Sequence, residues 1–154
     1  MTCSSNTTCT PDPGPRRAVP HILAAMVLAL SAPVGAASGN PAGTLVLQAK
    51  KDLAAGDGIA AEARLRQALD EGANRRAIAA YMGEAFLAQG DRERARQWLG
   101  AGAFSPSSAL AGYRALARLE KDEGHFDAAS AALDRARATA PDDPEVWVDI
   151  ARLR

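Results

Sequence analysis

The segments GDGIAAEARL (residues 56–65), GDRERARQWL (residues 90–99) and GHFDAASAAL (residues 124–133) decide the fold of this chain. Each begins with a glycine, has an alanine five residues later and a leucine nine residues later, and each starts 34 residues after the previous one. Three residues beyond each leucine stands another small residue, Ala68, Gly102 or Ala136. A period of 34 residues is typical of helix–turn–helix units that stack into a solenoid. The sequence therefore predicts an all-α fold, a right-handed solenoid of antiparallel helix pairs.

The repeats are counted so that the recurring glycine is the fifteenth residue of each unit. This places the units at 42–75, 76–109, 110–143 and, as a partial unit, 144–154. Apolar residues at helical spacing predict helices over 44–55, 59–71, 76–89, 92–99, 107–123 and 127–139, and another that starts at residue 144. The recurring glycine should end the first helix of each unit in the left-handed conformation, which glycine adopts without a steric penalty. Gly100–Ala103 should weaken the end of the second unit.

The first 36 residues differ in composition from the repeats. A polar n-region, expected to be disordered, leads to Arg16 and Arg17 and then to an apolar run from Ile22 to Leu30. Small residues follow, so this order predicts a secretory signal peptide that is cleaved after Ala36, with Ala37 as the alternative position, and then a linker over 37–43. The alternative is a retained membrane anchor over 22–37, although its apolar run is shorter than the roughly 20 residues that a spanning helix needs.

Composition limits the classes of function. The chain is 47% hydrophobic and 23% charged, as expected for one ordinary soluble domain. Its 18 basic and 18 acidic residues give no net charge, so no strong field attracts nucleic acid or an anionic membrane. Cys3 and Cys9 are the two cysteines, and both lie in the leader, which excludes disulfides and cysteine metal sites from the repeats.

The units resemble the tetratricopeptide repeat family over residues 42–154. That family has small residues where the two helices of a unit approach closely, and this chain has Ala49, Gly83, Ala117 and Ala151 at the eighth position of its units. The resemblance implies that the repeat structure depends on Gly56, Ala61, Gly83, Gly90, Ala95, Ala117, Gly124, Ala129, Pro141 and Trp147. Trp98, Tyr113 and Trp147 are expected in the core. Gln48 and Asp52 depart from the pattern and predict a partly solvated first unit.

The repeats contain no recognisable catalytic motif. HExxH, GxSxG, phosphate-loop and CxxC patterns are absent from the sequence. His125 should lie in an exposed turn, as a cap or simply solvated. Asp142, Asp143 and Glu145 are better explained by a helix-start cap than by a cation site. We therefore expect a protein that is not an enzyme and that has no cofactor and no metal.

The resemblance also implies a binding face, because in this family the first helices of successive units line a concave groove. The candidate partner-binding residues on these helices are Lys50, Tyr81, Glu84, Arg114, Arg118 and Lys121. The three basic residues of the third unit share one helical face, so they could meet acidic groups of a peptide. The alternative is a solvated charged face, in which they pair with Asp122 or Asp149. The family's clamp for chaperone tails is not matched, since Tyr81 replaces an asparagine and Ala111 and Ala115 replace basic residues.

The leading hypothesis is a protein–protein interaction scaffold that is exported to the bacterial cell envelope, periplasmic or secreted after signal cleavage. Its partner would be a protein or peptide, not nucleic acid, and it would have no stable membrane span. The alternative is the N-terminal assembly module of a larger envelope enzyme, truncated at Arg154. The partial fourth unit favours truncation, and would leave Trp147, Ile150 and Leu153 exposed for self-association through the last helix.

Overall fold

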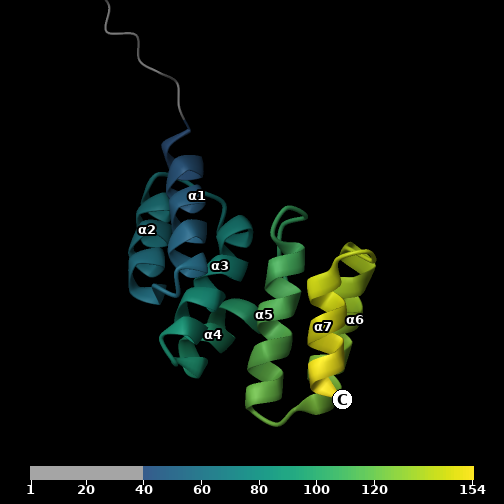
Figure 1. The fold of residues 1–154 in the computed structure, drawn as a ribbon. Helices are drawn as coiled ribbons and strands as arrows, with labels where there is room; N and C mark the ends of the chain where they lie inside the picture. The colour runs from purple at the N-terminus through teal and green to yellow at the C-terminus, as the bar shows by residue number, and fades with distance from the viewer. Residues whose placement is uncertain (1–39) are drawn as a thin grey trace, which may run out of the picture. The chain divides into compact units, whose positions relative to one another are not determined.

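The computed structural model describes residues 40–154, which form seven α-helices (Figure 1). In chain order these are α1 (Pro41–Ala54), α2 (Gly58–Asp70), α3 (Arg75–Ala88), α4 (Arg92–Leu99), α5 (Ala109–Asp122), α6 (Phe126–Thr139) and α7 (Pro144–Leu153). Helix α1 packs on α2, α3 on α4 and α5 on α6, and α7 packs on α6. The first helices of successive units also meet, since α3 contacts α1 and α5, and α5 contacts α7. The predicted all-α array of helix pairs is therefore confirmed for these residues.

The turn inside each unit has the predicted left-handed glycine. The φ angles of Gly56, Gly90 and Gly124 are 80°, 78° and 81°. The amide that follows each glycine donates to a carbonyl of the preceding helix, as in the 2.8 Å bond from His125 N to Glu120 O. This pattern satisfies carbonyls that would otherwise lack a partner at the helix end. The same turn geometry therefore recurs in three units, and this recurrence explains the glycine at every 34th residue.

The core lies where small residues let the two helices of a unit approach closely. Ala61, Ala95 and Ala129 are fully buried. Leu99 packs so close to Gly83 that a Cβ built on this glycine would lie 2.3 Å from Leu99 Cγ. The expected assignment of the recurring alanines and leucines to packing is therefore confirmed.

Helix α1 begins at Pro41, three residues before the predicted start at Thr44. Asn40 acts as the N-cap, because its Oδ1 accepts a bond from Gly43 N at 3.1 Å, and proline suits the first helical position. Residues 41–43 of the predicted linker are therefore helical. In the same unit Gln48 is exposed and Asp52 forms an ion pair with Arg64, so the first unit is partly solvated, as predicted.

The second unit loosens at its end, as the glycines there predict. Helix α4 stops at Leu99, and Gly102 adopts a φ of 58° outside any helix, so it is not the helical counterpart of Ala68 and Ala136. The loop that follows fills the space with Phe104, whose ring lies edge-on to Tyr113 with centroids 5.3 Å apart. Helix α5 then begins at Ala109, two residues later than predicted.

The prediction that Trp147 lies in the core is wrong. Its side chain is 50% exposed, and its Nε1 donates to the Pro141 carbonyl at 3.0 Å. The neighbouring residue Val146 is fully buried instead and anchors α7. Ala151, on the same helix, is also exposed. Trp98 and Tyr113 are half-buried against the rest of the array.

The signal peptide, the retained anchor and residues 37–39 of the linker lie outside the described residues and stay predictions. Among helices α1 to α7, none is both long and apolar enough to cross a bilayer.

Candidate functional site

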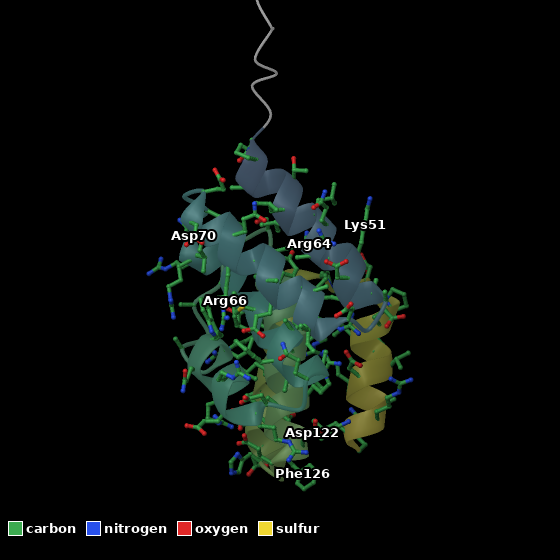
Figure 2. All side chains as sticks on the ribbon, turned by 90° about the vertical axis from the view of Figure 1, so that its left-hand side faces the viewer. Lys51, Arg64, Arg66, Asp70, Asp122 and Phe126 are labelled. Carbon is green, nitrogen blue, oxygen red and sulfur yellow. The ribbon has the colours of Figure 1, made fainter. Side chains whose placement is uncertain are left out.

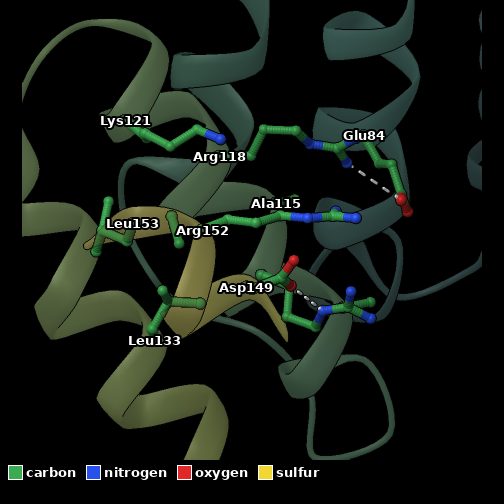
Figure 3. A pocket seen from close by; sticks show the side chains of 11 residues that line it. Glu84, Ala115, Arg118, Lys121, Leu133, Asp149, Arg152 and Leu153 are labelled. Atoms are coloured by element: carbon green, nitrogen blue, oxygen red, sulfur yellow. Dashed lines mark hydrogen bonds and ion pairs between the residues drawn. The ribbon is translucent and has the colours of Figure 1, made fainter. Parts of the chain in front are cut away.

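A cavity of about 300 Å³ opens between the first helices α3, α5 and α7 (Figure 3). We call it the α5 cavity, because α5 contributes most of its lining. The lining residues are Glu84, Ala111, Arg114, Ala115, Ala117, Arg118, Lys121, Leu133, Asp149, Arg152 and Leu153. Small and aliphatic residues thus form its apolar part, while charged side chains from three helices surround it. This is the face on which the sequence places the candidate groove.

The repeat register brings the charged residues of the cavity together. Glu84, Arg118 and Arg152 follow one another at intervals of 34 residues, so they occupy equivalent sites on α3, α5 and α7. Glu84 and Arg118 contact each other at 3.4 Å, between Oε1 and Nη2. Four of the six predicted binding residues, Glu84, Arg114, Arg118 and Lys121, therefore line one cavity.

The other two predicted binding residues lie apart from this cavity. The Nζ of Lys50 lies 4.6 Å from the ring centroid of Tyr81, which is a cation–π contact between α1 and α3. Tyr81 is only 8% exposed and belongs to the hydrophobic core, so little of its ring is open to a partner. The structure thus divides the predicted site into a cavity at α5 and a separate pair at α1.

The cations of the α5 cavity differ in how far they are already paired. Arg114 donates from Nε to Asp149 at 2.6 Å and from Nη2 to Glu145 at 3.2 Å. Burial lowers the pKa of Arg114, but the hydrogen bonds and charges of Asp149 and Glu145 outweigh burial, so the net shift of the pKa is upward. Within residues 40–154, Lys121 and Arg152 form no ion pair. The alternative of a self-paired face therefore holds for Arg114, through Asp149 as expected, and for Arg118, through Glu84.

The opposite sides of the helix pairs carry mixed charges without such a cavity. On α2, the side chains of Arg64, Arg66 and Asp70 place two positive charges and one negative charge on the surface (Figure 2). Phe126 is 59% exposed at the start of α6, next to charged neighbours. These isolated features lack the combination of an apolar hollow and converging cations that marks the α5 cavity.

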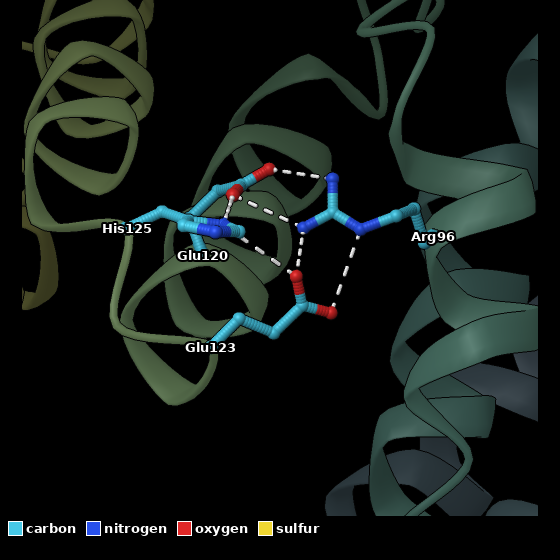
Figure 4. Close-up of polar contacts among 4 residues, drawn as sticks. All are labelled: Arg96, Glu120, Glu123 and His125. Atoms are coloured by element: carbon cyan, nitrogen blue, oxygen red, sulfur yellow. Dashed lines mark hydrogen bonds and ion pairs between the residues drawn. The ribbon is translucent and has the colours of Figure 1, made fainter.

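A second charged cluster joins α4 to α5 (Figure 4). Arg96 donates to Glu120 with two bonds of 3.0 and 3.1 Å, and also bonds Glu123. The guanidinium of Arg96 holds the pKa of Glu120 below its usual value, because the hydrogen bonds favour the ionised carboxylate. Glu120 is only 8% exposed, so this pairing offsets the cost of burying its charge. The sequence offered one signal for the cluster, because Glu120 holds the position that the buried Phe86 holds in the second unit.

This cluster is better explained as a set of ion pairs that stabilises the packing of α4 on α5 than as a metal site. Ligand atoms of Glu120, Glu123 and His125 lie within 4.8 Å of one another, a spacing that could hold a cation. However, Arg96 already occupies both carboxylates, and its positive charge opposes a second cation. His125 is exposed, as predicted, and its Nδ1 lies 2.9 Å from Glu120 Oε2 rather than capping α6. The acidic run before α7 is confirmed as a cap, since Asp143 accepts a bond from Glu145 N at 2.9 Å.

Comparison with known proteins agrees with this geometry. Residues 110–153 match the family model described as tetratricopeptide repeat, and the match spans α5, α6 and α7. No curated protein and no solved structure matches the chain. The described chain is thus an array of seven helices packed in sequential pairs, and its residues 110–153 carry a tetratricopeptide repeat.

Proposed function

We propose that this protein is a non-enzymatic interaction scaffold that binds a protein partner on the face formed by α1, α3, α5 and α7. The observation that carries the proposal is the α5 cavity, in which side chains of α3, α5 and α7 converge. The tetratricopeptide repeat match supports a protein partner in general terms. Packing explains the residues that recur every 34 positions, so we assign binding to the side chains between those positions.

The shape of this face favours a protein segment over a small molecule. The cavity of about 300 Å³ is at the small end for an enclosed ligand site, and it is lined by side chains of four helices, α3, α5, α6 and α7. Leu47 on α1 and Val148 on α7 are 57% and 42% exposed, and they extend the apolar surface along the first helices. An extended segment would contact several first helices at once, as repeat arrays allow.

The proposal includes export to the cell envelope of a bacterium, and only the sequence of the leader supports this part. Fractionation of cells that express the full chain with a C-terminal tag would test it, together with N-terminal sequencing of the product. A mature N-terminus immediately after Ala36 in the periplasmic fraction is expected. Full-length protein in the cytoplasm would refute export without affecting the binding proposal.

Site-specific photo-crosslinking tests the binding face. A photoreactive amino acid would replace the exposed residues Leu47 or Arg118 on first helices, and Gln67 or Ala131 on second helices as matched exposed controls. Crosslinked products should form in cells from the first-helix positions and be much weaker from the controls. Equal capture from both sets, or capture from the second helices alone, would place the partner elsewhere.

A further inference from the structure

We propose that the α5 cavity recognises an acidic segment within the partner. One apolar side chain of this segment enters the cavity, while the carboxylates on either side of it bind Lys121 and Arg152. This inference rests on the proposed function and specifies the chemistry of the partner. It depends on three features of the cavity, which are its apolar lining, its excess of positive charge and the lack of neutral polar groups.

The lining of the cavity suits one apolar side chain. Ala111 and Ala115 lie one turn apart on α5 and leave space that larger residues would fill. Leu133 of α6 and Leu153 of α7 line the same hollow, and Leu133 is only 4% exposed. An aliphatic side chain placed here would exchange water for apolar contacts, which favours binding in proportion to the area covered.

The charges around this lining favour acidic flanking residues. The cavity is lined by four basic and two acidic side chains, so it has a formal excess of two positive charges. Glu84 and Asp149 are each engaged by an arginine of α5. Lys121 and Arg152 have no acidic partner within residues 40–154, and their side chains reach across the same region of the cavity as Arg118 (Figure 3). Lys121 and Arg152 would therefore bind carboxylates of the partner.

The available donors favour side-chain carboxylates over the carboxyl end of a chain. The lining contains no Asn, Gln, Ser, Thr or Tyr side chain, so all its side-chain donors are cationic. A carboxyl end brings only one carboxylate, which one arginine can bind through both oxygens, so it would leave either Lys121 or Arg152 without an acidic group. Lys121 and Arg152 belong to different helices, α5 and α7, and both border the apolar lining. Two cations from different helices can each meet one carboxylate of a segment whose apolar side chain fills the hollow.

Peptide titrations of the full chain test this chemistry. The probe is a fluorescein-labelled peptide Glu-Glu-Leu-Glu-Glu with both ends blocked, measured by anisotropy. It should bind about tenfold more tightly than Glu-Glu-Ser-Glu-Glu, because the serine peptide loses the apolar contact. Lys-Lys-Leu-Lys-Lys should not bind, and binding of the acidic peptide should weaken between about 50 mM and about 500 mM NaCl.

Two variants connect the binding to the proposed cations. Lys121→Glu combined with Arg152→Glu should abolish binding of the acidic peptide and create binding of Lys-Lys-Leu-Lys-Lys. Lys51→Glu, an exposed lysine on α1 without an ion pair in the described chain, is the control and should change neither affinity. Circular dichroism of each variant would establish that the helices are intact.

Each alternative result overturns the inference in a recognisable way. Equal binding of the leucine and serine peptides would exclude the apolar insertion, and unchanged specificity in the double variant would exclude Lys121 and Arg152. Binding that requires a free carboxyl end would assign the cavity to chain termini instead. If all peptides fail while crosslinking from Arg118 still captures a partner, then this chemistry is wrong and the proposed function stands.

Discussion

Replacing Gly83 by alanine tests the closest approach between two helices of this protein. Gly83 lies in the middle of α3, opposite Leu99 at the end of α4. A Cβ at this position would lie 2.3 Å from Leu99 Cγ, and 2.5 and 2.9 Å from its two methyl carbons. Leu99 is fully buried, so it has no open space into which it can rotate. The added methyl group must therefore push the helices apart or force Leu99 out of its preferred rotamer.

Two opposing effects set the size of the change in unfolding free energy. Alanine favours a helix over glycine by about 0.5–1 kcal/mol, which would stabilise the variant. Overpacking of a filled core destabilises by about 1–3 kcal/mol. The contact at 2.3 Å involves Cγ near the base of the leucine side chain, so the upper part of that range applies. We expect Gly83→Ala to be destabilised by about 1–2 kcal/mol.

Urea unfolding of the full chain, followed by circular dichroism, measures this difference. Ala117→Gly is the matched control, because Ala117 holds the equivalent place in the third unit. It should lose about 1–2 kcal/mol, since the lower helix propensity of glycine adds to the loss of a buried methyl group. In a Leu99→Ala background the added methyl group has room, so Gly83→Ala should become stabilising by about 0.5–1 kcal/mol. If Gly83→Ala stabilises the protein with Leu99 intact, then the helices do not approach as described.

Three further predictions concern stability. Arg96→Ala should lower the unfolding free energy by about 1–2 kcal/mol at neutral pH. The pKa of Glu120 lies below its ordinary value of 4.5, so its ion pair with Arg96 stabilises the fold fully above pH 4.5 and less as the pH falls below it. The difference in unfolding free energy between the variant and the parent should therefore shrink at acid pH, which urea unfolding at neutral and at acid pH would measure. Gly124→Ala should cost about 1 kcal/mol in thermal melts, since its φ of 81° strains any Cβ although nothing lies within 4 Å; a neutral result would contradict the turn. Val146→Ala should cost about 1.5–3 kcal/mol and Trp147→Ala less than about 1 kcal/mol, because the valine is buried and the tryptophan is half-exposed; the reverse order of melting temperatures would restore Trp147 to the core.

The candidate site was predictable in part, because the repeat register assigns residues to faces. The positions of Glu84, Arg114, Arg118 and Lys121 on first helices follow from counting along the 34-residue unit. The same counting could not separate Lys50 and Tyr81 from the cavity, since it gives no distances between units. Nor could it pair Arg96 with Glu120, because the two lie 24 residues apart and meet only through the packing of α4 on α5.

The sequence by itself determined the helices, their turns and the small residues between them. These features depend on local rules, such as the left-handed glycine at residue 90 and the aspartate that caps the next helix, whose Oδ1 accepts from Arg94 N at 2.9 Å. The tertiary structure alone decided which side chain of α7 is buried, which charges pair across units and where the face is hollowed. Those outcomes depend on distances between helices that are remote in the chain. They are set by how whole side-chain volumes fit together, and no periodicity along the sequence encodes that fit.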